Sequence, residues 1–246
     1  MQGAERDTKM LRYLDHKAMG RGVHGWLDSH FHFSFAEYFD PRNIQFGALR
    51  VINDDLVKAG NGFSTHPHEN MEIISYVVDG ELTHGDSMGN QQTLTRGQVQ
   101  YMSAGRGVQH SEHNLGSDTL RFLQVWIFPD KNGYEPNYGD YRFDFEERVN
   151  QWLPIATWTE NKESQAPIKI RQDVNVYATY LKAGETARFS VGDGRQAYLV
   201  LIEGEADVNG VVDLGARDAL EIVEEDVVLT TAKEDAHIFL VEMKKP

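Results

Sequence analysis

Short apolar segments recur along the whole chain, and Gly, Asn or Asp residues punctuate the stretches between them. Segments of strand length cover residues 48–52, 71–78, 120–128, 176–181, 197–202 and 227–230. Helical periodicity is weak, and residues 143–152 are the best helical candidate. Closely spaced strands without helices between them are typical of a β-sandwich or a β-barrel. The pattern therefore predicts an all-β protein.

The chain also contains an internal repeat at low sequence identity. Gly60 and Gly184 are 124 residues apart, and so are Gly80 and Gly204. A polar, turn-rich segment at residues 130–139 separates the two copies, as expected for a linker. The repeat predicts two tandem β-barrels of similar topology, one in residues 1–135 and one in residues 136–246.

The amino-acid composition and net charge indicate which classes of partner the protein is suited to bind. The chain has 246 residues, with 24 Lys and Arg against 38 Asp and Glu, a formal net charge of −14. This balance disfavours nucleic acid and anionic membranes as partners. No apolar run approaches the roughly 20 residues of a membrane helix, and no signal-peptide segment is evident. We expect a cytoplasmic monomer that binds neither nucleic acid nor membrane. The absence of cysteine excludes disulfides, thiol nucleophiles and thiolate metal sites.

Two short segments carry pairs of metal-ligand residues, His66 with His68 and His110 with Glu112. Residues at i and i+2 of a strand point to the same face, so two adjacent strands could direct all four side chains at one point. Three imidazoles and one carboxylate suit a catalytic divalent transition metal better than Mg²⁺ or Ca²⁺. The spacing therefore predicts one metal centre with positions left open for a substrate.

The second copy of the repeat lacks these ligands. Ser190 and Gly192 stand where the first copy has its paired histidines, and nine of the ten histidines lie at or before His113. We therefore predict that the second barrel holds no metal of this kind and supports the fold or walls one side of the site.

Other histidines have simpler interpretations. His30 and His32 also have the i, i+2 spacing, but they lie among aromatic residues and favour buried, hydrogen-bonded positions. His84 follows a strand at a Gly-Asp turn and is predicted to be exposed. His237 lies in an apolar segment and is predicted to occupy a strand of the core or edge.

The first histidine segment resembles the first cupin motif. Gly60, His66, His68, Glu72 and Gly80 approximate its fixed positions, with one extra residue before the last glycine. The second motif is approximated by residues 97–114, in which a serine replaces the usual proline and two extra residues precede the histidine. The stretches that are more closely similar to the pirin family are residues 25–29, 33–35, 65–68, 72–80, 86–90 and 103–112.

The resemblance implies a bicupin, two tandem jelly-roll barrels with a metal in the N-terminal barrel. It also implies that His66, His68, His110 and Glu112 are the ligands. Glu72 is the alternative carboxylate, because it would share a face with the histidines if the strand ran unbroken. Fe²⁺ is the first choice of metal, and Mn²⁺, Ni²⁺, Co²⁺, Cu²⁺ and Zn²⁺ are compatible with the ligand set.

Bacterial pirin-like proteins are associated with quercetinase activity. The resemblance therefore predicts a metal-dependent dioxygenase that opens a flavonol such as quercetin with O₂, and Glu112 would be its general base. One alternative is a regulatory, metal-binding interaction module like the eukaryotic nuclear member of the family. Another is a different cupin dioxygenase or isomerase chemistry at the same site.

Overall fold

The computed structural model describes residues 9–246, so the first eight residues of the predicted N-terminal domain lie outside it. Strands dominate this part of the chain, and each of the six predicted apolar segments coincides with a strand, apart from one terminal residue in four of them. The predicted helical segment at 143–152 contains only a short 3₁₀ helix, η2 (Phe145–Arg148), and a second one, η1 (His16–Ala18), follows the first strand. Within residues 9–246, no helix is long and apolar enough to cross a membrane. The all-β prediction is confirmed.

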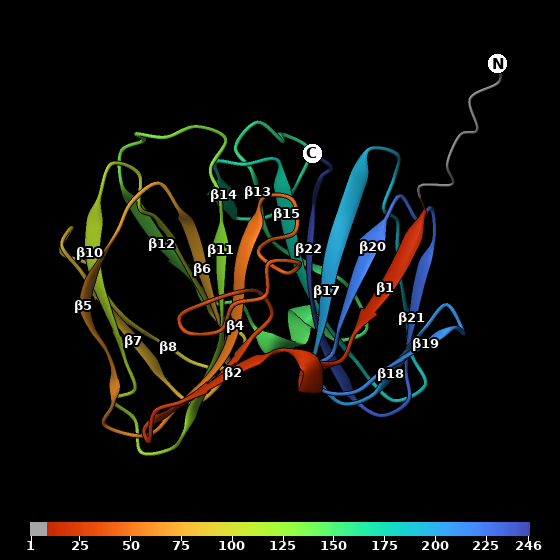
Figure 1. Cartoon of the computed structure of the whole chain (residues 1–246), viewed down its shortest axis with the longest axis horizontal. Helices are drawn as coiled ribbons and strands as arrows, with labels where there is room; N and C mark the ends of the chain where they lie inside the picture. Colours follow the sequence, from red (N-terminus) through yellow and green to blue (C-terminus); the bar gives the residue numbers. More distant parts are fainter. Residues whose placement is uncertain (1–8) are drawn as a thin grey trace.

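The chain forms two sandwiches, each of one four-stranded and one seven-stranded sheet, and each half of the chain supplies most of the strands of one sandwich (Figure 1). In the first half, the four-stranded sheet has the order β5 (Gly62–His68), β10 (Val108–His113), β7 (Leu82–Asp86) and β8 (Gln91–Leu94). The seven-stranded sheet has the order β12 (Asn137–Tyr141), β9 (Val99–Ser103), β6 (Glu72–Asp79), β11 (Leu120–Ile127), β4 (Leu49–Val57), β3 (Leu27–Phe31) and β2 (Gly20–Val23). This is the first of the two predicted jelly-roll barrels.

The second half repeats the arrangement. Its four-stranded sheet has the order β16 (Thr186–Phe189), β21 (Val228–Ala232), β18 (Ala206–Val208) and β19 (Val212–Leu214). Its seven-stranded sheet has the order β1 (Met10–Leu14), β20 (Ala219–Val223), β17 (Arg195–Glu203), β22 (Ala236–Lys244), β15 (Val174–Leu181), β13 (Leu153–Trp158) and β14 (Ile168–Ile170). Two barrels of similar topology, as the repeat predicted, therefore lie side by side (Figure 1).

The two barrels exchange their edge strands. β1, red in Figure 1, pairs with β20 of the second barrel, where Met10 lies opposite Val223. β12 pairs with β9 of the first barrel, although it follows the predicted boundary at residue 135. β1 and β12 are thus the edge strands at equivalent ends of the two seven-stranded sheets, and their partners β20 and β9 occupy equivalent positions. A single cut in the chain does not separate the two sheet systems.

The two seven-stranded sheets pack against each other through a shared apolar core. Side chains alternate between the two faces of a strand, so Ile74, Tyr76 and Val78 of β6 face the second barrel, whereas Ser75 and Val77 face the first barrel's interior. Second-barrel residues that share this core include Ile155, Val176, Tyr198, Val200, Phe239 and Val241. On each central strand, only every second side chain therefore points into the first barrel's interior.

A buried polar network crosses the same interface. The hydroxyl of Tyr76 accepts a hydrogen bond from the Arg148 guanidinium and bonds His237 Nε2 at 2.7 Å. His237 Nδ1 lies 3.1 Å from Glu203 Oε2, and Arg148 Nη2 donates to the Gly97 carbonyl oxygen at 2.8 Å. Burial lowers the pKa of His237 to about 4, so this ring is neutral near pH 7. The fully buried Arg148 charge depends on these acceptors, because an unpaired buried cation is costly.

The Tyr76→Phe substitution should test this network. It removes the hydroxyl that serves both Arg148 and His237, so we expect the free energy of unfolding to fall by about 1–3 kcal/mol. Urea unfolding followed by fluorescence measures the change. Tyr141→Phe, at a half-exposed residue, is the control and should change stability by less than about 0.5 kcal/mol. Equal stability of the two variants would refute the assigned role of the network.

Candidate metal centre

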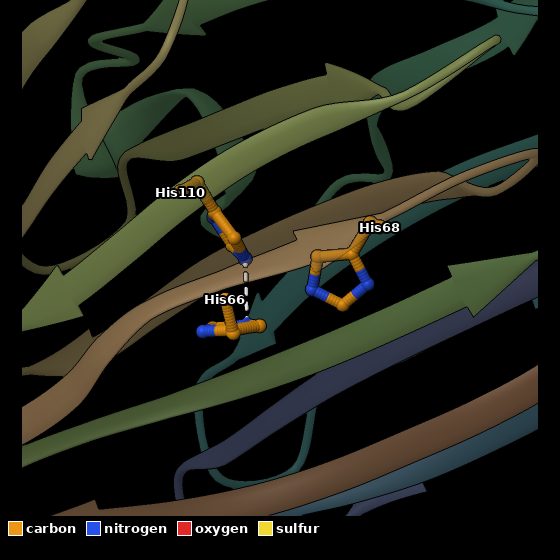
Figure 2. Close-up of side chains that lie close together, drawn as sticks. All are labelled: His66, His68 and His110. Atoms are coloured by element: carbon orange, nitrogen blue, oxygen red, sulfur yellow. Dashed lines mark hydrogen bonds between the residues drawn. The ribbon is translucent and has the colours of Figure 1, made fainter.

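The three predicted histidines converge from two adjacent strands. His66 and His68 lie on β5, His110 lies on β10, and His66 is directly opposite His110 in the sheet. Figure 2 shows the three rings turned toward one another, and their ligand nitrogens all lie within 4.8 Å of each other. His66 Nε2 and His110 Nε2 are 3.0 Å apart. Two neighbouring nitrogen ligands about 2.1 Å from one ion, at right angles, would be about 3.0 Å apart.

Hydrogen bonding indicates which nitrogen of His66 is available. Its Nδ1 lies 2.8 Å from the Ser64 carbonyl oxygen, and a carbonyl can only accept, so Nδ1 carries the proton. The lone pair is then on Nε2, which faces the centre of the cluster. Burial, reinforced by neighbouring histidines, lowers the pKa of His68 to about 4 and of His110 to about 3. These rings are therefore neutral near pH 7, the form that binds a metal. The donor set fits a divalent transition metal.

Glu112 lies inside the same barrel but is held by three donors. Its Oε1 accepts hydrogen bonds from Ser75 Oγ at 2.8 Å and Gln100 Nε2 at 2.7 Å. Its Oε2 accepts one from Gln124 Nε2. Each carboxylate oxygen has about two lone pairs, so one acceptor site remains, on Oε2. The carboxylate is not part of the 4.8 Å cluster formed by the three histidines.

An irregular strand pairing accompanies the offset of Glu112 from the cluster. On β10 it follows His110 by two residues, and both side chains are buried. Opposite β5, however, the register shifts between them, so that Glu112 faces Phe63. A bulge of this kind redirects side chains locally, and the i, i+2 spacing alone cannot reveal it.

Glu72, the alternative carboxylate, points to the other face of its sheet. The strand breaks after His68, and Asn70 adopts a positive φ of 49°, so the alternation restarts in β6. Glu72 then accepts hydrogen bonds from Tyr101 Oη and Ser103 Oγ, both at 2.6 Å, and from the Arg171 backbone N–H at 3.1 Å. These contacts join the two barrels. The unbroken strand that would have placed Glu72 beside the histidines is not present.

A cavity of about 270 Å³ opens beside the histidines. Its lining residues are His24, Leu27, Ser29, Phe31, Phe35, Ala36, Asn53, Asp55, Phe63, His66, His68, Glu112, Gln124 and Trp126. Trp126 makes edge-to-face contacts with His68 and Phe35, and its Nε1 donates to Gln124 Oε1 at 3.2 Å. Aromatic walls and a group of carboxyl and amide side chains are typical of a site for a flat, partly polar molecule.

Sequence reasoning missed the polar side chains that surround Glu112. Ser75 lies opposite both Gln100 and Gln124 in the seven-stranded sheet, so the three form one row beneath the carboxylate. Each is a buried polar residue on a strand face whose other buried residues are apolar, and this pattern was the signal that the sequence offered. Their convergence depends on strand register between segments about 25 residues apart.

The equivalent row in the second barrel is apolar. Leu199 lies opposite Leu220 and Leu240, just as the serine lies opposite the two glutamines. All three leucines belong to a continuous core inside that barrel. The prediction that this barrel holds no metal of the same kind stays a prediction, and this row gives a physical reason for it.

The remaining histidines divide between confirmed and wrong predictions. His32 is buried and bonds the Tyr198 hydroxyl at 3.1 Å, and His237 is a core residue of β22, both as predicted. His30 is half-buried. The exposed position predicted for His84 is wrong, because the ring is fully buried beside Asp86.

Comparison with known proteins gives matches in both halves of the chain. The family model described as Pirin matches residues 13–127, and the model described as Quercetinase C-terminal cupin domain matches residues 159–243. A protein of Caulobacter vibrioides named Pirin-like protein is 44% identical over 224 residues, which cover 91% of this chain and 95% of that protein. A protein of Escherichia coli K12 named Quercetin 2,3-dioxygenase is 38% identical over 225 residues, which cover 91% of this chain and 94% of that protein.

A solved structure shows the same architecture with a metal. The crystal structure of the bacterial pirin YhhW from Escherichia coli in complex with nickel(II) has a TM-score of 0.88 and 36% sequence identity to this chain. The match covers 96% of this chain and 100% of the other.

Burial of Asp55 at the cavity should make the stability of the protein depend on pH. It is buried at the cavity and accepts a hydrogen bond from Ser29 Oγ, and burial raises its pKa from 3.8 to about 7. The folded protein therefore holds this proton more tightly than the unfolded chain, and stability falls as pH rises from about 4 to 7. The Asp55→Asn substitution removes the titrating group, and with it this loss of stability. The stability of the metal-free variant relative to wild type should therefore increase over this range, by on the order of 4 kcal/mol at most.

Urea unfolding of the metal-free proteins at several pH values measures this difference. Asp193→Asn makes the same chemical change at an exposed position and should follow the wild-type curve. Parallel pH profiles for wild type and Asp55→Asn would show that Asp55 is not the buried acid.

Proposed function

Because the chain belongs to the pirin family, we propose that it is a metal-dependent dioxygenase that opens a flavonol such as quercetin with O₂. The observation that carries the proposal is the position of three converging imidazoles at an aromatic-walled cavity that also contains a carboxylate. A relative named for this activity supports the choice of reaction. A cavity of about 270 Å³ lies near the lower end of the range for small-molecule sites, which suits a compact substrate.

His66, His68 and His110 would hold one divalent transition metal, and Glu112 is the proposed fourth ligand. Fe²⁺ remains the first choice, and the nickel complex of a related pirin supports Ni²⁺ as the alternative. When bound, the metal would act as a Lewis acid that lowers the pKa of the flavonol 3-hydroxyl group. Positions on the ion that these side chains do not fill would be open to exogenous molecules.

Glu112 is the proposed general base, and its hydrogen bonds define how it would act. Only Oε2 has an acceptor site left, so metal coordination and proton acceptance compete for the same lone pair. Glu112 would therefore accept and hold the substrate proton at Oε2. Ser75 and Gln100 hold Oε1 throughout, which keeps the carboxyl group oriented during the transfer.

The cavity walls would orient the substrate. Phe35, Phe63 and Trp126 present aromatic faces and edges to flat rings, while Asn53 and Asp55 offer partners for phenolic hydroxyl groups. The same apolar walls exclude water from the reacting carbons, which protects an electron-rich flavonolate from unproductive protonation.

The Glu112→Gln variant tests the proposed base. Glutamine keeps the shape of the side chain but cannot accept the substrate proton at neutral pH, so turnover should fall by about 10²–10⁴-fold. The loss of quercetin absorbance in air, after anaerobic metal loading, measures turnover. Glu81→Gln, at an exposed position, is the matched control and should retain full activity. A Glu112→Gln enzyme with wild-type turnover would refute the role of Glu112.

Reconstitution with different metals tests the reaction class. Activity should scale with metal content up to one ion per chain, and removal of the metal should abolish quercetin consumption. Elemental analysis and the absorbance assay, run on the Fe²⁺, Mn²⁺, Ni²⁺, Co²⁺, Cu²⁺ and Zn²⁺ forms, give both quantities. A protein that binds one ion tightly in every form but never consumes quercetin would contradict the dioxygenase while preserving the metal centre.

A further inference from the structure

A second pair of titratable side chains lies behind His110. His84 and Asp86 of β7 have fully buried side chains, and the two ring centroids of His84 and His110 are 5.5 Å apart. The His84 ring stacks on Tyr138 of β12 with centroids 4.5 Å apart and an interplanar angle of 17°. None of these residues except His110 belongs to the proposed ligand set, and the proposed reaction uses none of the other three.

Hydrogen bonds determine the protonation pattern of this pair. Asp86 accepts from the backbone N–H groups of Met88 and Asn90 and from the Asn90 side chain, as an ionised carboxylate does. His84 Nε2 lies 2.9 Å from Asp86 Oδ2, so Nε2 carries the proton that this bond needs. In the neutral ring, His84 Nδ1 then presents a lone pair.

The matching donor is on His110. Its Nε2 faces His66 at 3.0 Å, in the centre of the histidine cluster, so its proton belongs on Nδ1. Among the described residues, His110 Nδ1 and His84 Nδ1 are both buried and have no hydrogen-bond partner. One is a donor, the other is an acceptor, and the rings are neighbours. Buried polar atoms of this kind are rarely left unpaired.

We propose that His84 is the positioning residue of the metal centre, and that it accepts the Nδ1 proton of His110 directly or through one water molecule. Asp86 fixes the tautomer of His84, so that Asp86, His84 and His110 form a chain leading to the metal position. This inference rests on the proposed metal centre. Such outer partners orient a ligating imidazole and raise its basicity, and their loss typically weakens metal affinity by about 10–100-fold.

The second barrel supports a link between this pair and metal binding. The repeat offset of 124 residues carries His84 to Val208 and Asp86 to Gly210. Val208 is a buried core residue of β18. At the position equivalent to His84, an apolar side chain is therefore enough to fill the core of the barrel. The barrel that has the three converging histidines is also the barrel that has the buried His-Asp pair.

The affinity for Co²⁺, measured by competition with a chromophoric chelator, tests the proposal in wild type, His84→Phe and His84→Gln. Phenylalanine keeps the stacking on Tyr138 but has no lone pair, so affinity should fall by about 10–100-fold and the cobalt absorption spectrum should change. Glutamine offers an amide oxygen as acceptor and should restore most of the affinity. His113→Phe, on the opposite face of β10, should bind like wild type.

Thermal unfolding of the metal-free proteins separates loss of fold from loss of affinity. The proposal is overturned if His84→Phe binds Co²⁺ with wild-type affinity and spectrum. It is also overturned if the phenylalanine and glutamine variants are equally weak. His110→Ala provides the separate test of the metal centre, because undiminished binding in that variant would place the metal elsewhere and would refute both proposals.

Discussion

The packing of the two seven-stranded sheets against each other constrains the rest of this molecule. It commits one face of every central strand to an apolar core between the barrels, where Tyr76 and Phe239 are fully buried. Only the opposite face is then free to build each barrel's interior. Because side chains alternate between the two faces of a strand, the position of a residue in this packing decides whether it can point into the first barrel's interior. Ser75 can reach Glu112 in the first barrel's interior, and Glu72 cannot.

The two interiors show two ways of filling the same space. The second barrel uses leucines, each of which stabilises the fold by about 1.5–3 kcal/mol when buried. The first barrel buries Glu112 together with a serine and two glutamines that donate hydrogen bonds to its carboxylate. Such buried polar groups contribute little net stability, and leaving one of them unpaired is costly. We infer that the apolar barrel and the shared core compensate for the polar interior next to them. A chain with two such polar barrels would have less apolar surface to bury.

The spacing of residues along single strands was enough to predict the histidine cluster, because its geometry is set within and between two adjacent strands. The i, i+2 pairs needed only strand alternation, so the convergence of His66, His68 and His110 followed from the sequence together with the family resemblance. The face of Glu72 did not, because a break of three residues restarts the alternation. His84 was misplaced because a Gly-Asp turn signals exposure, whereas packing by Tyr138 from a strand more than 50 residues later buries it. The bonds around Glu112 required the register of three strands, which single-chain patterns do not contain.

The exchanged edge strands have a consequence for the order in which the chain can fold during synthesis. β1 is made first, but its partner β20 ends at Val223, so β1 must wait for more than 200 residues. At about 5–20 residues per second, that wait is roughly 10–40 s on the ribosome. The first barrel likewise lacks its last edge until β12 has been made. Between the synthesis of β1 and that of β20, the emerging chain therefore carries a strand without its sheet partner, whereas the first seven-stranded sheet can be completed as soon as β12 has been made.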